Sequence, residues 1–189
     1  PQYVLQWHTD NGLYGHAINY GRHVPNDLKF LMEKDERLQK YQWIPAIRQQ
    51  YYGQATDSCL EYADTSNFIN HRWSLSMAKL ANKLVVKQDS HRTRVIDNKL
   101  ELVDAQQMLL EDSPEKLAES ELMLPEAIIQ LALKKLSSRQ GMDDQVQLAT
   151  VALAVCAAME DQKIALQYAA NVWATCFRLD DNLWDMWTQ

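Results

Sequence analysis

Apolar residues recur at helical spacing along most of this chain. From about residue 67 onward, three or four positions separate successive apolar residues, which places them on one face of an α-helix. The clearest stripe consists of Ile69, Trp73, Met77, Leu80 and Leu84. This stripe predicts a long helix, and we expect its apolar face to be buried.

Further long helices are predicted over residues 95–110, 125–136, 143–159 and 161–179. Pro114 and Pro125 suit the first turn of a helix, where the missing N–H of proline is not needed. The last helix carries one apolar face with Ile164, Tyr168, Val172 and Cys176, and another with Leu166, Ala170, Trp173 and Phe177. Because both faces are apolar, we expect this helix to pack between layers.

The first 66 residues predict shorter helices. Gly12 and Gly21 follow short apolar patterns, as is typical of residues that end a helix. Asn26 or Asp27 is predicted to cap the next helix, because both side chains can accept a hydrogen bond from a free N–H in the first turn.

Asp35 is predicted to begin another helix, which runs until Pro45 interrupts its hydrogen bonds. Residues 51–63 form an amphipathic helix, and the polar residues 64–67 end it and cap its successor. We therefore divide the chain into an N-terminal block, residues 1–66, and a C-terminal block of longer helices, residues 67–189, which could also form one continuous domain.

The composition favours an all-α fold. Gly and Pro together account for only 10 of 189 residues, and good helix formers dominate the rest. Nearly every predicted connection is short, so successive helices are expected to pair as antiparallel hairpins. The predicted architecture is an irregular α-solenoid, or a stack of such hairpins, without a fixed sequence repeat.

Charge and cysteine content narrow the function classes. The net charge is −6 and no basic cluster occurs, which argues against nucleic acid as a direct partner. Cys59, Cys156 and Cys176 are far apart and surrounded by apolar residues, as is typical of buried thiols in an intracellular protein. The longest apolar run, residues 148–159, is too short to cross a bilayer, so no membrane insertion is expected. The chain begins in mid-pattern, as a piece of a longer protein would.

No catalytic or cofactor-binding motif is found, so we predict no enzyme activity, no cofactor and no metal. The five glycines form no phosphate-binding loop. His8, His16 and His23 lie eight and seven positions apart, whereas helical metal pairs lie three or four apart. The alternative is an all-α metal-dependent enzyme that uses Asp180, Asp181 and Asp185. These residues resemble the aspartate-rich motif of terpene synthases, although Trp184 stands where that motif has its third aspartate.

Aromatic residues are concentrated near the N-terminus. Ten of the 17 aromatic residues, including seven of the eight tyrosines, fall within the first 62 positions. Aromatic residues and Met are enriched at protein interfaces, where a few residues contribute most of the affinity. Residues 28–47 carry more apolar groups than two short helices can bury. The predicted partner-binding residues in this segment are Phe30, Leu31, Met32, Tyr41 and Trp43.

Several segments resemble a known family in their order and spacing. They are Leu28-Lys29-Phe30-Leu31, Trp43-Ile44-Pro45-Ala46-Ile47, the helix over residues 55–63, Ser74-Leu75-Ser76-Met77-Ala78-Lys79-Leu80-Ala81, Ala170-Asn171-Val172-Trp173-Ala174 and Arg178-Leu179-Asp180-Asp181-Asn182-Leu183-Trp184. Together they are similar to the C-terminal helical domain of nucleoporin 133, a scaffold protein of the Y-shaped nuclear pore subcomplex.

The resemblance implies a structural module of the nuclear pore complex, at the nuclear envelope, that serves nucleocytoplasmic transport, including mRNA transport. In that family the N-terminal block of this domain binds the C-terminal tail of nucleoporin 107. Carried over residue by residue, the contact falls on Lys29, Phe30, Leu31, Leu38, Trp43 and Ile44. A helical-repeat adaptor unrelated to the pore would share every one of these physical features.

Overall fold

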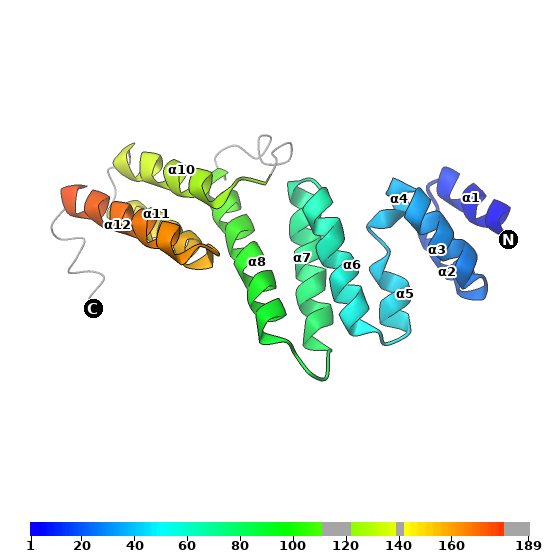
Figure 1. The fold of residues 1–189 in the computed structure, drawn as a ribbon. Helices are drawn as coiled ribbons and strands as arrows, with labels where there is room; N and C mark the ends of the chain where they lie inside the picture. Colours follow the sequence, from blue (N-terminus) through cyan, green and yellow to red (C-terminus); the bar gives the residue numbers. More distant parts are fainter. Residues whose placement is uncertain (111–121, 139–141, 180–189) are drawn as a thin grey trace. The chain divides into compact units, whose positions relative to one another are not determined.

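The structure is a computed structural model that describes residues 1–110, 122–138 and 142–179, and every regular element in these ranges is helical. The all-α prediction is therefore confirmed (Figure 1). In chain order the elements are α1 (Gln2–Asp10), α2 (Tyr14–Tyr20), the 3-10 helix η1 (Gly21–His23), α3 (Pro25–Lys34), α4 (Glu36–Gln39), α5 (Trp43–Arg48), α6 (Tyr52–Thr65), α7 (Phe68–Lys83), α8 (Ser90–Leu110), α10 (Pro125–Ser138), α11 (Met142–Ala158) and α12 (Gln162–Leu179).

The chain forms two compact units, Pro1–Thr93 and Arg94–Gln189. The division differs from the boundary that we placed after residue 66. The reason is that α7 packs along α6, and the two helices lie side by side as a hairpin (Figure 1). This hairpin keeps α7 within the first unit.

Apolar clusters hold the helices of the first unit together. Helices α1 to α4 bury one that consists of Leu5, Ala17, Ile18, Leu28, Met32 and Leu38. A smaller cluster joins α5, α6 and α7 through Ala46, Ala55 and Ala81, with Trp43 and Ile47 packed against it. The small side chains of the three alanines allow these helices to approach closely.

Several predicted helix ends are confirmed. Gly12 has φ +71°, the left-handed conformation that glycine adopts without strain. Asn67 caps α7 by accepting a hydrogen bond from the N–H of Asn70 at 3.1 Å. Asp161 caps α12 through the N–H groups of Lys163 and Ile164, at 2.9 and 3.1 Å. Pro125 begins α10, as predicted.

The cap predicted for the third helix is wrong. Helix α3 begins at Pro25, and neither Asn26 nor Asp27 accepts a capping hydrogen bond, because both lie inside the first turn. Proline suits this first position because its fixed φ is close to the helical value and it lacks only an N–H that would have no partner in the helix. Asp27 still places a negative charge near the positive end of the helix.

The predicted helix from Asp35 to Pro45 is two helices. Asp35 caps the short helix α4, as expected, by accepting a hydrogen bond from the N–H of Arg37 at 3.0 Å. The chain then turns, and α5 begins at Trp43. Pro45 lies in the first turn of α5, where its missing N–H breaks no helical hydrogen bond.

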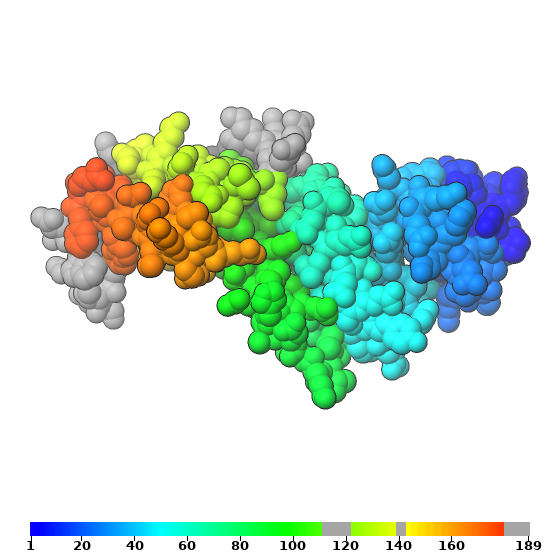
Figure 2. Space-filling view, in the orientation of Figure 1, coloured from blue at the N-terminus to red at the C-terminus, as the bar shows by residue number. Residues whose placement is uncertain are grey.

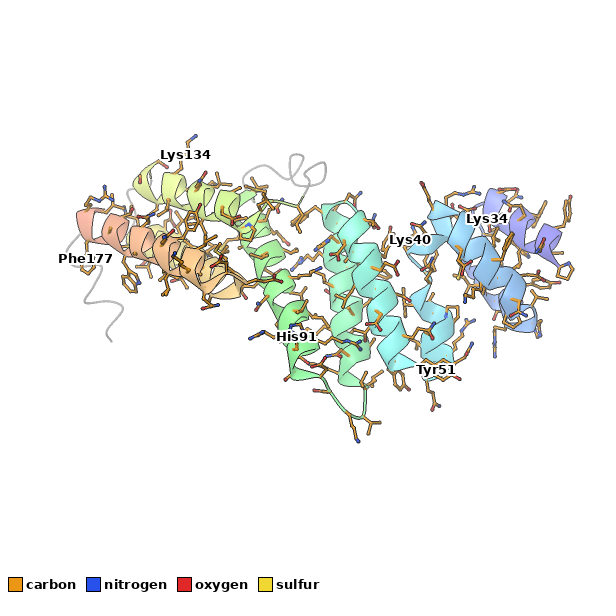
Figure 3. The ribbon with its side chains drawn as sticks, viewed as in Figure 1. Lys34, Lys40, Tyr51, His91, Lys134 and Phe177 are labelled. Carbon is orange, nitrogen blue, oxygen red and sulfur yellow. The ribbon has the colours of Figure 1, made fainter. Side chains whose placement is uncertain are left out.

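The apolar stripes of α7 and α12 are only partly buried. On α7 the buried positions include Phe68, Leu75 and Ala78, whereas four members of the predicted core stripe are exposed. On α12, Val172 and Cys176 of one predicted face are buried, but Ile164 of that face is exposed, as are Leu166 and Phe177 of the other face; Figure 3 shows Phe177 near the end of that helix. The predicted start at Pro114 lies outside the described residues.

The described residues of the second unit share a large apolar core. The C-terminal part of α8 packs with α10, α11 and α12 around Leu109, Ile128, Ile129, Leu136, Val155 and Val172. Gln106 is fully buried within α8, and its side-chain oxygen accepts a hydrogen bond at 2.8 Å from the N–H of Met123. None of the described helices is long and apolar enough to span a membrane.

Candidate protein-binding surface

A groove of about 250 Å³ lies between α1 and α3. Its walls follow from helix geometry, because residues three and four positions apart lie on the same side of a helix. Helix α1 contributes Gln2, Tyr3, Leu5 and Gln6, and α3 contributes Asp27, Phe30 and Leu31. In the space-filling view the dark blue atoms of α1 lie at the N-terminal end of the chain, against the neighbouring blue helices (Figure 2).

Phe30 is the most prominent apolar residue of α3 at this groove. Its side chain is 46% exposed, although Phe is among the residues most often buried. The Lys34 ammonium lies 4.2 Å from the centre of the Phe30 ring, a cation–π contact one helical turn away. Figure 3 labels Lys34 near the end of α3. Across the groove Tyr3 is also exposed, so two aromatic rings border one hollow.

Charged side chains join α1 to α4. The Arg37 guanidinium lies 3.0 Å from an Asp10 oxygen and 2.7 Å from an Asp35 oxygen. Hydrogen bonds from Gln6 and then Arg37 lower the pKa of Asp10, and hydrogen bonding to Arg37 lowers the pKa of Asp35. Both carboxylates therefore remain charged at neutral pH, which keeps this link intact.

Two of the predicted partner-binding residues are core residues. Met32 is 3% exposed and Leu38 is fully buried, and both pack in the cluster of α1 to α4. A partner cannot reach these side chains without unfolding the block. Their contribution to any interface is to hold α3 and α4 in place.

Leu31, Tyr41 and Ile44 are partly buried against the same cluster. Leu31 also lines the groove, so one side of it remains available to a partner. The Tyr41 ring lies 5.9 Å from the ring of Tyr14, which ties it to α2. Lys29 is exposed on α3, with its ammonium 3.9 Å from the Glu33 carboxylate.

Trp43 belongs to a different place from the groove. It packs against the small alanine cluster of α5, α6 and α7. Its indole N–H donates a hydrogen bond to the Lys40 carbonyl at 3.0 Å, and its ring lies 5.9 Å from the ring of Trp73. The predicted segment therefore does not form one continuous patch.

The α1 side of the groove was not predicted from the sequence. Tyr3, Gln2 and Gln6 belong to α1, for which we predicted only a short helix that ends at Gly12. Leu5 and Thr9 are buried and lie four positions apart, on one side of α1. Helical spacing places Tyr3 on another side of the same helix, so the sequence could have indicated that Tyr3 is not part of the core. The missing information was that α3 packs beside α1.

The described residues contain neither a metal-binding cluster nor an accessible thiol. Among residues 1–110, 122–138 and 142–179, no three His, Cys, Asp or Glu side chains are grouped so that they could hold a metal ion. Burial raises the pKa of Cys59 to about 12 and also raises the pKa values of Cys156 and Cys176. Asp180, Asp181 and Asp185, the alternative metal site, lie outside the described residues.

Comparison with protein-family models, with curated proteins and with solved structures finds no match for this chain.

Proposed function

We propose that this chain is a non-enzymatic assembly module that binds a helical segment of another protein in the α1–α3 groove. One observation carries the proposal: Phe30 and Tyr3 expose aromatic rings on opposite sides of a single apolar hollow. Exposed aromatic residues in a preformed hollow are typical of the few residues that dominate binding energy at protein interfaces.

The shape of the groove favours a helical ligand. Helices α1 and α3 border it. A third helix can pack against such a pair by placing the apolar residues at every third or fourth of its positions into the groove. Leu31, which is only partly buried, and the Phe30 ring supply apolar surface within the hollow, while Gln2, Gln6 and Asp27 offer polar groups at its edge. This combination of an apolar centre and a polar rim is the usual anatomy of an interface.

The identity of the partner rests on the sequence resemblance. We propose that the chain is a scaffold module of the nuclear pore complex, with its helices stacked as an irregular α-solenoid, and that the ligand is the C-terminal tail of nucleoporin 107. Lys29, Phe30 and Leu31, which the resemblance carries over to the contact, lie on α3 at or beside the groove.

Co-elution in size-exclusion chromatography with the nucleoporin 107 tail tests both parts. Phe30→Asp is the informative variant, because Leu31 also packs on the core and its substitution would disturb the fold. Phe177→Asp is the matched control, since Phe177 is a similarly exposed phenylalanine in the second unit. We expect the wild type and Phe177→Asp to co-elute with the tail and Phe30→Asp to weaken binding by about 30-fold or more.

The two possible failures are distinguishable. If the wild-type chain forms no complex with the tail, the partner assignment is wrong. If Phe30→Asp keeps its helical circular dichroism and still co-elutes fully, the tail binds elsewhere and the groove is not the site.

A further inference from the structure

Helix α7 carries an exposed apolar stripe that neither the core nor the α1–α3 groove uses. Its members, with their exposed fractions, are Ile69 (57%), Trp73 (41%), Leu80 (58%) and Leu84 (54%). We define these residues as the α7 stripe. Their regular spacing distinguishes them from the scattered apolar residues that any protein surface carries.

The α7 stripe has the dimensions of a helix-binding surface. Steps of four, seven and four residues keep its members on one side of α7, and from Ile69 to Leu84 they extend over about 22 Å. Next to the stripe the rings of Trp73 and Trp43 meet edge to face, with centroids 5.9 Å apart. A neighbouring helix therefore widens the apolar surface at Trp73.

Basic residues follow one border of the stripe. Arg72, Lys79 and Lys83 each directly precede a stripe residue, so all three lie on the same flank of the helix. Helix α7 contains no Asp or Glu, although the chain as a whole has a net charge of −6. The charge of α7 itself is thus opposite in sign to that of the whole chain.

This charge pattern selects the kind of partner. A second copy of this chain would bring the same three basic residues and no acidic residue on its own α7. A helix with an apolar stripe and acidic residues beside it would cover the exposed side chains and also attract the basic flank.

We propose that the α7 stripe is a second docking surface, which binds an amphipathic helix with acidic flanks from another protein. Together with the α1–α3 groove, it would allow the first unit to hold two protein partners at once. The surface uses none of the residues of the proposed groove, so the two proposals can fail separately.

A designed peptide tests this proposal by fluorescence anisotropy with the full chain. The probe is a labelled helix of about 18 residues, long enough to cover the stripe, with Leu at every third or fourth position and Glu on both flanks. A second peptide has the same Leu positions and Lys in place of every Glu. We expect the acidic peptide to bind and the basic peptide to bind at least about tenfold more weakly.

Variants of the chain locate the binding site. Leu80→Asp should weaken binding of the acidic peptide by about tenfold or more, and Lys83→Glu should weaken it in the same direction. Leu166→Asp is the matched control, because Leu166 is an exposed leucine of α12 in the second unit. This variant and Phe30→Asp should bind the acidic peptide as the wild type does. Circular dichroism checks that each variant is folded.

Four results would overturn the proposal. The first is no binding of the acidic peptide to the wild type, and the second is equal binding of the acidic and basic peptides. The third is wild-type affinity in folded Leu80→Asp. The fourth comes from sedimentation: a dimer of the wild type that Leu80→Asp abolishes would mean that a second copy occupies the stripe.

Discussion

Gly21 follows α2 at a point where the buried side chain of Leu28 leaves no room for a Cβ. The sequence pattern indicated a glycine that ends a helix, and Gly21 does follow the last residue of α2. Its φ of −58°, however, is one that any residue adopts. Glycine is needed because a Cβ at this position would lie 2.5 to 2.8 Å from side-chain atoms of Leu28. The contact joins two segments that local sequence patterns do not connect.

Gly21→Ala should therefore destabilise the first unit. We expect the free energy of unfolding to fall by about 1–3 kcal/mol, because Leu28 is buried and cannot move away freely. Gly15→Ala is the control, since a Cβ at Gly15 of α2 would meet nothing within 4 Å. That change should leave stability unchanged or raise it by up to about 1 kcal/mol. Urea unfolding measures both, and equal effects of the two substitutions would contradict the packing argument.

The buried thiols give a second test at this scale. Burial raises the pKa of Cys59 from 9.0 to about 12. At pH 8 we expect Cys59, Cys156 and Cys176 to resist a disulfide reagent in the native protein and to react once urea unfolds it. Rapid labelling of any one of them in the folded chain would contradict the assigned burial.

The same pKa shift makes stability depend on alkaline pH. The neutral thiol is favoured in the native state, so the contribution of Cys59 is fully present below pH 9 and is lost as the pH rises toward 12.

For the individual elements, the existence and type of the helices could be predicted from the sequence. Which side of each helix is exposed to solvent could not. Periodicity identified α7 as one helix with an apolar side, yet the buried side contains His71, Ser74 and Asn82, and the regular stripe is exposed. An apolar stripe indicates a face that needs a neighbour. It does not say whether that neighbour belongs to the same chain.

The start of α4 provides a prediction at this scale. Asp35 caps this helix and binds the Arg37 side chain, so Asp35→Ala should lower the free energy of unfolding by about 1 kcal/mol. Glu33→Ala is the control, because Glu33 makes only an exposed contact with Lys29, and it should cost about 0.5 kcal/mol or less.

The effect of Asp35→Ala should also depend on pH. Arg37 lowers the pKa of Asp35 below 3.8, so the advantage of the wild type is present above pH 4 and shrinks as the pH falls below that value. Thermal unfolding at pH 7 and pH 3 measures this, and a difference that is larger at pH 3 would contradict the capping role.

At the scale of the whole molecule, composition predicted the all-α fold, and part of the candidate site followed from the sequence. Phe30 and Leu31 do border the groove. Met32 and Leu38 instead belong to the core, and Trp43 belongs to the α5–α7 cluster. Apolar content in one segment could not separate these roles, because the core, the groove and the neighbouring cluster all use residues from the same twenty positions.

Our central proposal is that the α1–α3 groove binds the nucleoporin 107 tail, and hydrogen–deuterium exchange of the full chain with and without the tail tests this proposal most directly. Binding in the groove should slow exchange at amides of α1 and α3, because a ligand that binds only the folded state suppresses local opening. Amides of α10 to α12 should exchange as before. Protection confined to those helices, or no change at saturating tail, would contradict the account.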